Sequence, residues 1–196
     1  MGFNMNRQFL LDLILECRNC ELSGHRRQAV LPQGDWDSGV FFLGQAPGET
    51  ENQSGHPFCG PSGSILDLLF REAEFTRNEV YLTNLVKCHP PHNRRVRKDE
   101  IAACSCFVDQ EICLVKPRLI IPLGFYATRY IFDYLGKMNL IRADFPGYTG
   151  KIIEFSGFSI LPLAHPAVVF HQPQLEKSIM KKYFAAGNLI RRFRNS

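Results

Sequence analysis

The chain has 196 residues, of which 45% are hydrophobic and 21% charged, and this composition is typical of a globular protein with one compact domain, here residues 1–196. A chain of this length can fold without disulfide bonds, so its 7 cysteines suggest ligands rather than cross-links. No apolar run reaches the roughly 18 to 20 residues of a membrane span, and the first residues lack an export signal. We therefore expect a cytoplasmic protein, of the prokaryotic type and nucleoid-associated if it binds DNA, without a membrane partner.

The net charge of +4 is small, but the cations are clustered. One basic run contains Lys87, Arg94, Arg95, Arg97 and Lys98, and a second lies at the end of the chain. Such runs are typical of solvated loops and also of phosphate-binding surfaces. The charge therefore permits a polyanionic partner without requiring one.

The first expected element is a helix over residues 6–17, and short apolar runs then alternate with helical patterns. The expected strands are residues 40–43, 80–86, 119–123 and 159–163, with residues 151–155 as an additional antiparallel strand. The further expected helices are residues 62–74, 99–115, 125–135 and 174–193. This order predicts an α/β fold, a three-layer α/β/α sandwich around a central, mostly parallel four-stranded sheet.

Loops rich in glycine and proline follow the expected strands. The loop after the first strand begins at Gly44, and the one after the last contains His165, Pro166 and Ala167. Ligands of an open parallel sheet bind beyond the carboxyl ends of its strands, so these loops are candidate site segments. Their composition allows close approach of the backbone to a ligand, although a turn-rich connection without function has the same composition.

Four of the cysteines form two pairs in the sequence: Cys17 with Cys20, and Cys88 with Cys104. Four thiolates can hold zinc or an iron–sulfur cluster, and the wide second spacing argues against a zinc ribbon. Cys106, two residues after Cys104, is the alternative ligand. Cys113 lies on an apolar helical stripe, where we expect it to fill the core.

Taken together, these motifs resemble those of the family-4 uracil-DNA glycosylases, the iron–sulfur branch of the uracil-DNA glycosylase superfamily. The matching segments are the Cys-x-x-Cys pair and residues 44–48, 55–60, 83–88, 90–94 and 165–167. Each motif alone is weak, whereas their order and spacing extend over almost the whole chain. The resemblance implies excision of uracil from DNA by a monomer that carries a 4Fe–4S cluster on Cys17, Cys20, Cys88 and Cys104.

The resemblance also implies a base-binding site, because a base must be flipped out of the stack before its glycosidic bond can be attacked. Phe58 would stack on the flipped ring, and Asn84 would accept from uracil N3–H and donate to O4, which excludes cytosine. His165 would donate to uracil O2 as negative charge develops there. Glu51 would lie beside the pyrimidine C5 and exclude the methyl group of thymine. Without the resemblance, a turn-capping Asn, a core aromatic residue and a structural His explain the same residue types.

The remaining predicted contacts surround this site. Gly44 and Ala46 would line the base pocket, and Lys87, Arg94 and Pro166 would contact DNA. The apolar run after His165 would supply a wedge for the vacated stack, with Val169 or Phe170 as the inserted side chain, although packing in the core explains the run equally well.

One catalytic position departs from the family, because Gln45 stands where the family has Glu. An amide cannot accept a proton from water, so the chain is either a slower glycosylase or a protein that binds the lesion without efficient turnover. Glu49 or Glu51 could replace the missing acid. A nucleotide-binding zinc enzyme is a weaker third interpretation, because the chain lacks the corresponding glycine-rich loops.

Overall fold

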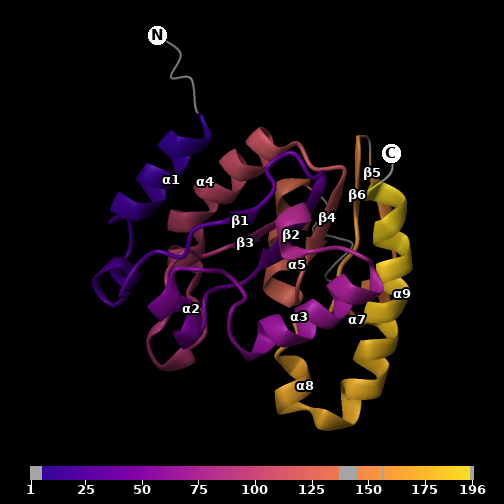
Figure 1. Ribbon diagram of the computed structural model, residues 1–196. Coiled ribbons are helices and arrows are strands. Elements are labelled where there is room, and N and C mark those ends of the chain that lie inside the picture. Colours follow the sequence, from indigo (N-terminus) through magenta and orange to yellow (C-terminus); the bar gives the residue numbers. More distant parts are fainter. Residues whose placement is uncertain (1–5, 137–144, 156, 195–196) are drawn as a thin grey trace.

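The computed structural model describes residues 6–136, 145–155 and 157–194 (Figure 1). The strands form one six-stranded sheet in the order β1–β3–β2–β4–β6–β5. They are β1 (Gln33–Gly34), β2 (Val40–Gly44), β3 (Tyr81–Asn84), β4 (Leu119–Pro122), β5 (Ile153–Phe155) and β6 (Phe158–Ile160). Strands β3, β2, β4 and β6 pair in parallel, and β1 and β5 add an antiparallel strand at each edge. The α/β fold is confirmed, whereas the expected four strands are the parallel centre of a larger sheet.

All five predicted helices form in the described part of the chain, where three short helices, residues 49–54, 145–148 and 168–171, were not predicted. The helices are α1 (Arg7–Glu16), α2 (Glu49–Ser54), α3 (Pro61–Glu72), α4 (Lys98–Val115), α5 (Phe125–Tyr134), α7 (Phe145–Tyr148), α8 (Val168–His171) and α9 (Glu176–Arg194). Short 3₁₀ turns are η1 (Glu21–Gly24), η2 (Arg77–Glu79), η3 (Pro91–Asn93) and η4 (Pro173–Leu175). Within the described part of the chain, no helix has both the length and the apolarity of a membrane span.

Alternating side chains of the buried strands supply the two faces of the core. In β2, Phe42 packs toward α3 and α9, whereas Phe41 packs toward α4 and α5. Both rings are fully buried, and burial of one such side chain stabilises the fold by about 1.5–3 kcal/mol. The period of two explains why a strand with no exposed residue separates two layers of helices.

A third apolar cluster lies outside these two layers. Leu10 and Ile14 of α1 pack with Phe107 of α4 and with Val86, and Figure 1 shows α1 beside α4. The predicted metal-binding cysteines belong to the same cluster. The N-terminal helix is therefore fixed by this cluster and not by the sheet.

The order of the strands leaves a crevice at one end of the sheet. The chain passes from β2 to β3 on one side of it and then crosses from β3 to β4 on the other side of β2. Gly44, the last residue of β2, is the register partner of Asn84, the last residue of β3. Ligands of open α/β sheets bind at such a reversal of strand order, so the fold directs attention to these two residues.

Candidate active site

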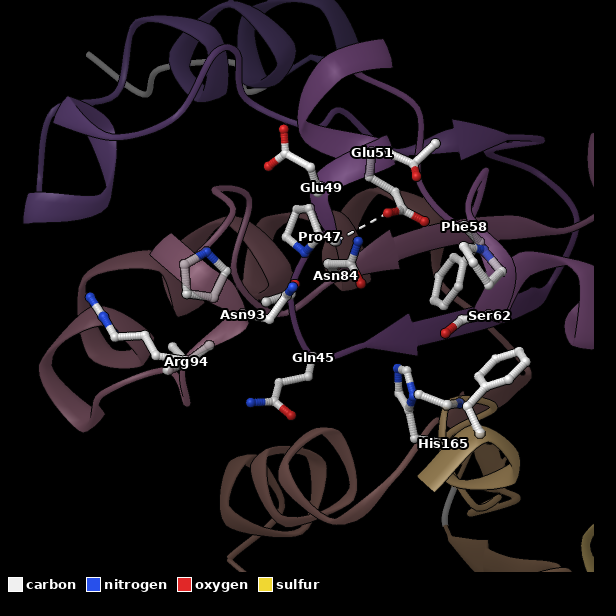
Figure 2. A pocket seen from close by; sticks show the side chains of 18 of the residues that line it. Gln45, Pro47, Glu49, Glu51, Phe58, Ser62, Asn84, Asn93, Arg94 and His165 are labelled. Carbon is white, nitrogen blue, oxygen red and sulfur yellow. Dashed lines mark hydrogen bonds between the residues drawn. The ribbon is translucent and has the colours of Figure 1, made fainter. Parts of the chain in front are cut away.

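A cavity of about 850 Å³ opens where β2 and β3 end (Figure 2). It lies within the size range of small-molecule sites. Of the residues predicted to bind or process a base, it brings together Gln45, Ala46, Glu51, Phe58, Asn84 and His165. Ser62, Asn93 and His171 also line it and were not predicted as site residues. Asn93 lies in the matched segment 90–94, so the motif itself was the signal that could have identified it.

Gly44 allows two functional side chains to meet over the end of β2. A Cβ atom on Gly44 would overlap Oδ1 of Asn84 and lie 2.6 Å from Cζ of Phe58. Asn84 is 4% exposed, and within the described residues no hydrogen bond engages its side-chain amide. Figure 2 shows this amide in the centre of the cavity with the ring of Phe58 beside it. A flat ring that enters here meets both a stacking surface and a free amide.

Phe58 adopts a backbone conformation that favours glycine, with φ of 54°. For a bulky residue this costs about 1–3 kcal/mol, so the surrounding structure must hold it. The Phe58 carbonyl lies against Gly63, where a Cβ atom would overlap it, and Arg77 donates to the carbonyls of Pro57 and Gly63 at 3.4 and 3.3 Å. The start of α3 therefore fixes the ring in the wall of the cavity.

Glu51 joins the two loops that form the roof of the cavity. Its Oε2 accepts from the Gly48 N–H at 3.1 Å and its Oε1 from the Gly60 N–H at 3.0 Å. The side chain is buried, and both glycines leave room for the carboxylate. The carboxylate thus supports the loops around the base site in addition to lining it.

His165 extends from the loop after Leu163 toward Asn84 and Phe58 (Figure 2). Its Nδ1 accepts from the Ala167 N–H at 3.2 Å, so the ring proton resides on Nε2. Desolvation lowers the pKa of His165 to about 4. The ring is therefore neutral at physiological pH and offers one hydrogen-bond donor.

Gln45 lies at the margin of the cavity on the same side as His165 (Figure 2). The two neighbouring carboxylates, Glu49 and Glu51, lie on the other side of Asn84 in that view. Glu49 accepts from Gln53 at 2.8 Å, which holds its pKa below the ordinary value, and its Oε2 lies 3.4 Å from Nε2 of His89. Both acids therefore have partners within their own loops, and neither faces Gln45.

The structure corrects the prediction that Lys87 contacts DNA. Its side chain is 1% exposed, and Nζ lies 2.8 Å from Oε1 of Glu111, which is fully buried. The sequence places Lys87 at the start of a basic run, but Glu111 is 24 residues away on α4 and cannot be identified as its partner from spacing alone. Lys87 therefore belongs to the interior.

Arg94 lines the cavity, although its charge is already paired. Its guanidinium donates to both carboxylate oxygens of buried Glu100, at 2.5 and 3.0 Å. Arg97 also bonds to Glu100 and to Glu21. Arg95 is exposed and, in the part of the chain that the structure describes, has no side-chain partner.

The loop after His165 is only partly as predicted. Pro166 is buried and Val169 is 8% exposed, within the core behind α3 and α9. Neither side chain therefore offers more than a small area for the predicted contact with DNA. Phe170 is 51% exposed and lines the cavity, so it is the residue of this run that can project from the protein.

The four predicted cysteine ligands share the apolar cluster between α1 and α4. Cys88 and Cys104 are buried, and Cys17 and Cys20 are partly buried against them. Burial raises the pKa of Cys104 to about 12, and it also raises the pKa of Cys88. Without a bound metal, these two thiols are therefore protonated at neutral pH.

Two donors point at the buried sulfurs. Arg26 donates to Sγ of Cys88 at 3.0 Å and to the Cys17 carbonyl at 3.0 Å, and the Lys87 N–H lies 3.3 Å from Sγ of Cys104. Within residues 6–136, 145–155 and 157–194, no three His, Cys, Asp or Glu side chains converge on a position for a single metal ion. The ligands of a 4Fe–4S cluster each bind a different iron, so they need not converge in that way.

The remaining cysteines lie at the surface. Cys106 and Cys113 are exposed on α4, and Cys59 is exposed in the loop before α3. The expectation that Cys113 fills the core is wrong, because the face of α4 that carries it is turned to solvent.

The fold and the cavity are those of an enzyme superfamily. The family model described as the Uracil DNA glycosylase superfamily matches residues 31–188, and the chain belongs to this superfamily. The matched residues include all six strands and every cavity residue named above.

Several relatives are type-4 uracil-DNA glycosylases, as the motifs predict. The chain is 36% identical to the one from Saccharolobus solfataricus over 183 residues, which cover 91% of this chain and 83% of the relative. It is 34% identical to the one from Pyrobaculum aerophilum over 191 residues, 95% of this chain and 97% of the relative. The type-4 enzyme from Thermotoga maritima is 31% identical over 193 residues, again 95% and 97% of the two chains.

Proposed function

We propose that the protein excises uracil from DNA by hydrolysing the N-glycosidic bond, leaving an abasic site. The observation that supports this best is the convergence of Asn84, Phe58 and His165 on one cavity above Gly44. Uracil flipped into this cavity would stack on Phe58, and its N3–H and O4 would meet the Asn84 amide. Cytosine presents the opposite pattern of donor and acceptor at these two positions. Ala46 and Glu51 would complete the wall, with Glu51 beside C5, where thymine has its methyl group.

His165 would stabilise the departing base. As the glycosidic bond breaks, negative charge collects on uracil O2 and positive charge on the sugar. A neutral His165 donates its Nε2–H to O2 without introducing a cation that would repel the sugar. Gln45 can hold and orient the attacking water, but it cannot accept the proton of that water. The proton therefore leaves to solvent or to another acceptor after attack on the cationic sugar.

We further propose that DNA lies over the mouth of the cavity. Phe170 would fill the space left in the base stack, and Arg94, although paired with Glu100, presents its guanidinium at the rim. A single chain supplies all of these groups, so we propose a monomer as the active form.

We propose that Cys17, Cys20, Cys88 and Cys104 hold a 4Fe–4S cluster. The donor set fits this group, because four thiols lie in an apolar environment and receive hydrogen bonds from Arg26 and from the Lys87 N–H. When bound, the cluster supplies a cross-link among α1, the segment after β3 and α4. We assign it a structural role.

An assay at enzyme excess tests the proposed activity. The protein is incubated with an oligonucleotide that carries one uracil, and abasic sites are then cleaved with alkali. Cleavage at the uracil position is expected, with none in the matched oligonucleotide that carries thymine and with much slower cleavage by the His165→Ala protein. Gln45 favours one competing function, binding of the lesion without turnover. Tight binding of the uracil oligonucleotide with no cleavage would establish that function instead.

A further inference from the structure

A buried ion pair lies behind Asn84, and the chemistry proposed above does not use it. The side chains of Lys87 and Glu111 are 1% and 0% exposed. Removing two charges from water costs several kcal/mol, and an apolar pair of similar volume often gives equal or greater stability. Stability alone therefore does not explain why this position holds two charges.

The ammonium group of Lys87 has three protons, and each has an acceptor. Nζ donates to Oγ1 of Thr83 at 2.7 Å, to the backbone carbonyl of Asn84 at 2.8 Å and to the Glu111 carboxylate at 2.8 and 2.9 Å. Three acceptors in three directions fix the position of Nζ. The ion pair thus holds the backbone carbonyl of Asn84, and the side chain of Asn84 faces the cavity.

Asn84 is held from both sides as a result. Behind it, its carbonyl accepts from Lys87, and in front its Oδ1 lies against Gly44, where no side chain intervenes. Asn84 is the last residue of β3, and the peptide that follows it donates its Leu85 N–H to the Gly44 carbonyl at 2.9 Å, so Lys87 holds the carbonyl side of this peptide. Rotation of that peptide would move the amide away from the position where it meets a base.

The same contacts tie Asn84 to α4. Cys104 and Glu111 are both buried on that helix and are seven residues apart, so they lie on one face of it. Lys87 contacts both, through its N–H at 3.3 Å from Cys104 Sγ and through Nζ at Glu111. These two contacts of Lys87 therefore fix the end of β3 relative to α4, next to Asn84.

We infer that the Lys87–Glu111 pair is a positioning device for Asn84, which holds the base-reading amide in the orientation that selects uracil. The inference rests on the proposed role of Asn84 as the residue that reads the base. Lys87 and Glu111 do not touch the substrate, and their effect on excision passes through Asn84.

A mutant cycle tests this. The pair variant Lys87→Met with Glu111→Leu replaces both charges by apolar groups of similar volume, and Asn84→Ala removes the base-reading amide. Single-turnover excision of uracil and urea denaturation are measured for the wild type, for each variant and for their combination. We expect the pair variant to keep the stability of the wild type but to excise uracil about ten- to a hundredfold more slowly. In the Asn84→Ala background the same replacement should change the rate by less than about twofold.

The outcomes separate the two proposals. A pair variant with the wild-type rate, or with the same loss in both backgrounds, overturns the inference and leaves the role of Asn84 intact. A wild-type rate in Asn84→Ala refutes the reading of the base by Asn84, and the inference with it.

A milder change is available in case the pair variant does not fold. Thr83→Val removes one acceptor from Lys87 without stranding a charge, and it enters the same cycle with a smaller expected loss. The matched control is Tyr130→Phe, which removes a hydrogen bond to Asp109 elsewhere on α4 and should leave the rate unchanged.

Discussion

Gln45 places a neutral amide where the resemblance predicts an acid, and under the proposed function this residue would orient the attacking water. A carboxylate at this position can accept the proton of the water and offset the positive charge of the sugar. Replacing Gln45 with Glu should therefore raise the single-turnover rate on a uracil oligonucleotide by about ten- to a hundredfold. Gln45→Ala should reduce the rate less than His165→Ala does. A rate that falls in Gln45→Glu would show that the amide is adapted to the mechanism.

Under the proposed function, Asn84 reads the base through an amide that both donates and accepts. An ionised carboxylate only accepts, so Asn84→Asp loses the donor to uracil O4 and gains an acceptor for the exocyclic amine of cytosine. We expect excision of uracil to drop by about a hundredfold, with cytosine excision appearing or uracil excision being abolished. Oligonucleotides that differ only in the target base provide the measurement. Unchanged excision of uracil with continued rejection of cytosine would remove Asn84 from base recognition.

His165 gives the pH dependence of the site. Its pKa is lowered by desolvation from the ordinary 6.5 to about 4, so the ring stays neutral between about pH 5 and pH 8. The single-turnover rate should show no step near pH 6.5 and should fall only toward pH 4, where protonation of Nδ1 opposes the Ala167 N–H. In the unfolded chain His165 has its ordinary pKa of 6.5, so it binds a proton at a higher pH there than in the folded protein. Its contribution to stability is therefore complete above pH 6.5 and is lost as the pH falls toward 4. A step in the rate at pH 6.5 that disappears in His165→Ala would contradict the neutral ring.

At the scale of elements, the cysteine cluster joins α1 to the segment after β3 and to α4. Protein purified without oxygen should be brown and contain about four irons per chain. Cys104→Ser should lose the iron and most of the stability to urea, because the four proposed ligands act together. Cys106→Ser is the matched control on the same helix, two residues away, and should keep both. Loss of iron in Cys106→Ser but not in Cys104→Ser would show that Cys106, and not Cys104, is the fourth ligand. Stoichiometric zinc in place of iron would overturn the assignment of a 4Fe–4S cluster.

The elements that the sequence predicts well are those with long apolar periodicity, such as α3, α4 and the parallel strands. α2 was missed because its residues, ETENQS, have no apolar stripe. It forms because Gly48 precedes it in extended conformation and the Glu51 carboxylate accepts from the Gly48 N–H. β1 has two residues and is defined only by pairing with β3, so no local pattern reveals it.

The structure brings predicted site residues together where motifs lie at the ends of strands, whereas the exposure of a residue was misjudged where its burial depends on a distant partner. Gln45, Asn84 and His165 meet in the cavity because parallel strands end at one edge of the sheet. The exposure of Lys87 was misjudged, because Glu111 comes from a helix far along the chain. Charge in a sequence indicates a partner, but it does not say whether that partner is DNA or the interior of the protein.

Across the whole molecule, ion pairs within the protein determine which basic side chains remain available to bind DNA. Lys87, Arg94 and Arg97 are paired within the protein, whereas Arg95 and Lys98 are exposed without a described side-chain partner. Arg95→Ala should weaken binding of all DNA sequences alike and reduce the slope of log affinity against log salt by about 1. Titrations of a fluorescent oligonucleotide at several salt concentrations measure this slope.

The control for that experiment lies at the opposite end of α4. Lys116 is also exposed, but it follows the last residue of the helix, whereas Arg95 precedes the first. Lys116→Gln should leave the slope unchanged. An equal effect of both substitutions would mean that net charge, and not a surface near the cavity, determines the affinity.

The packing of α1 against α4 also has a consequence for the order in which the protein is completed during synthesis. Much of the cluster that buries Leu10 and Ile14 comes from residues after β3, such as Val86 and Phe107, and Cys17 is separated from Cys104 by nearly half the chain. Helix α1 therefore leaves the ribosome well before α4 and cannot complete its docking until α4 has emerged. Under the proposed ligand set, iron would find all four cysteines only at that late stage, so a shortage of iron would prolong the exposure of α1 to proteases.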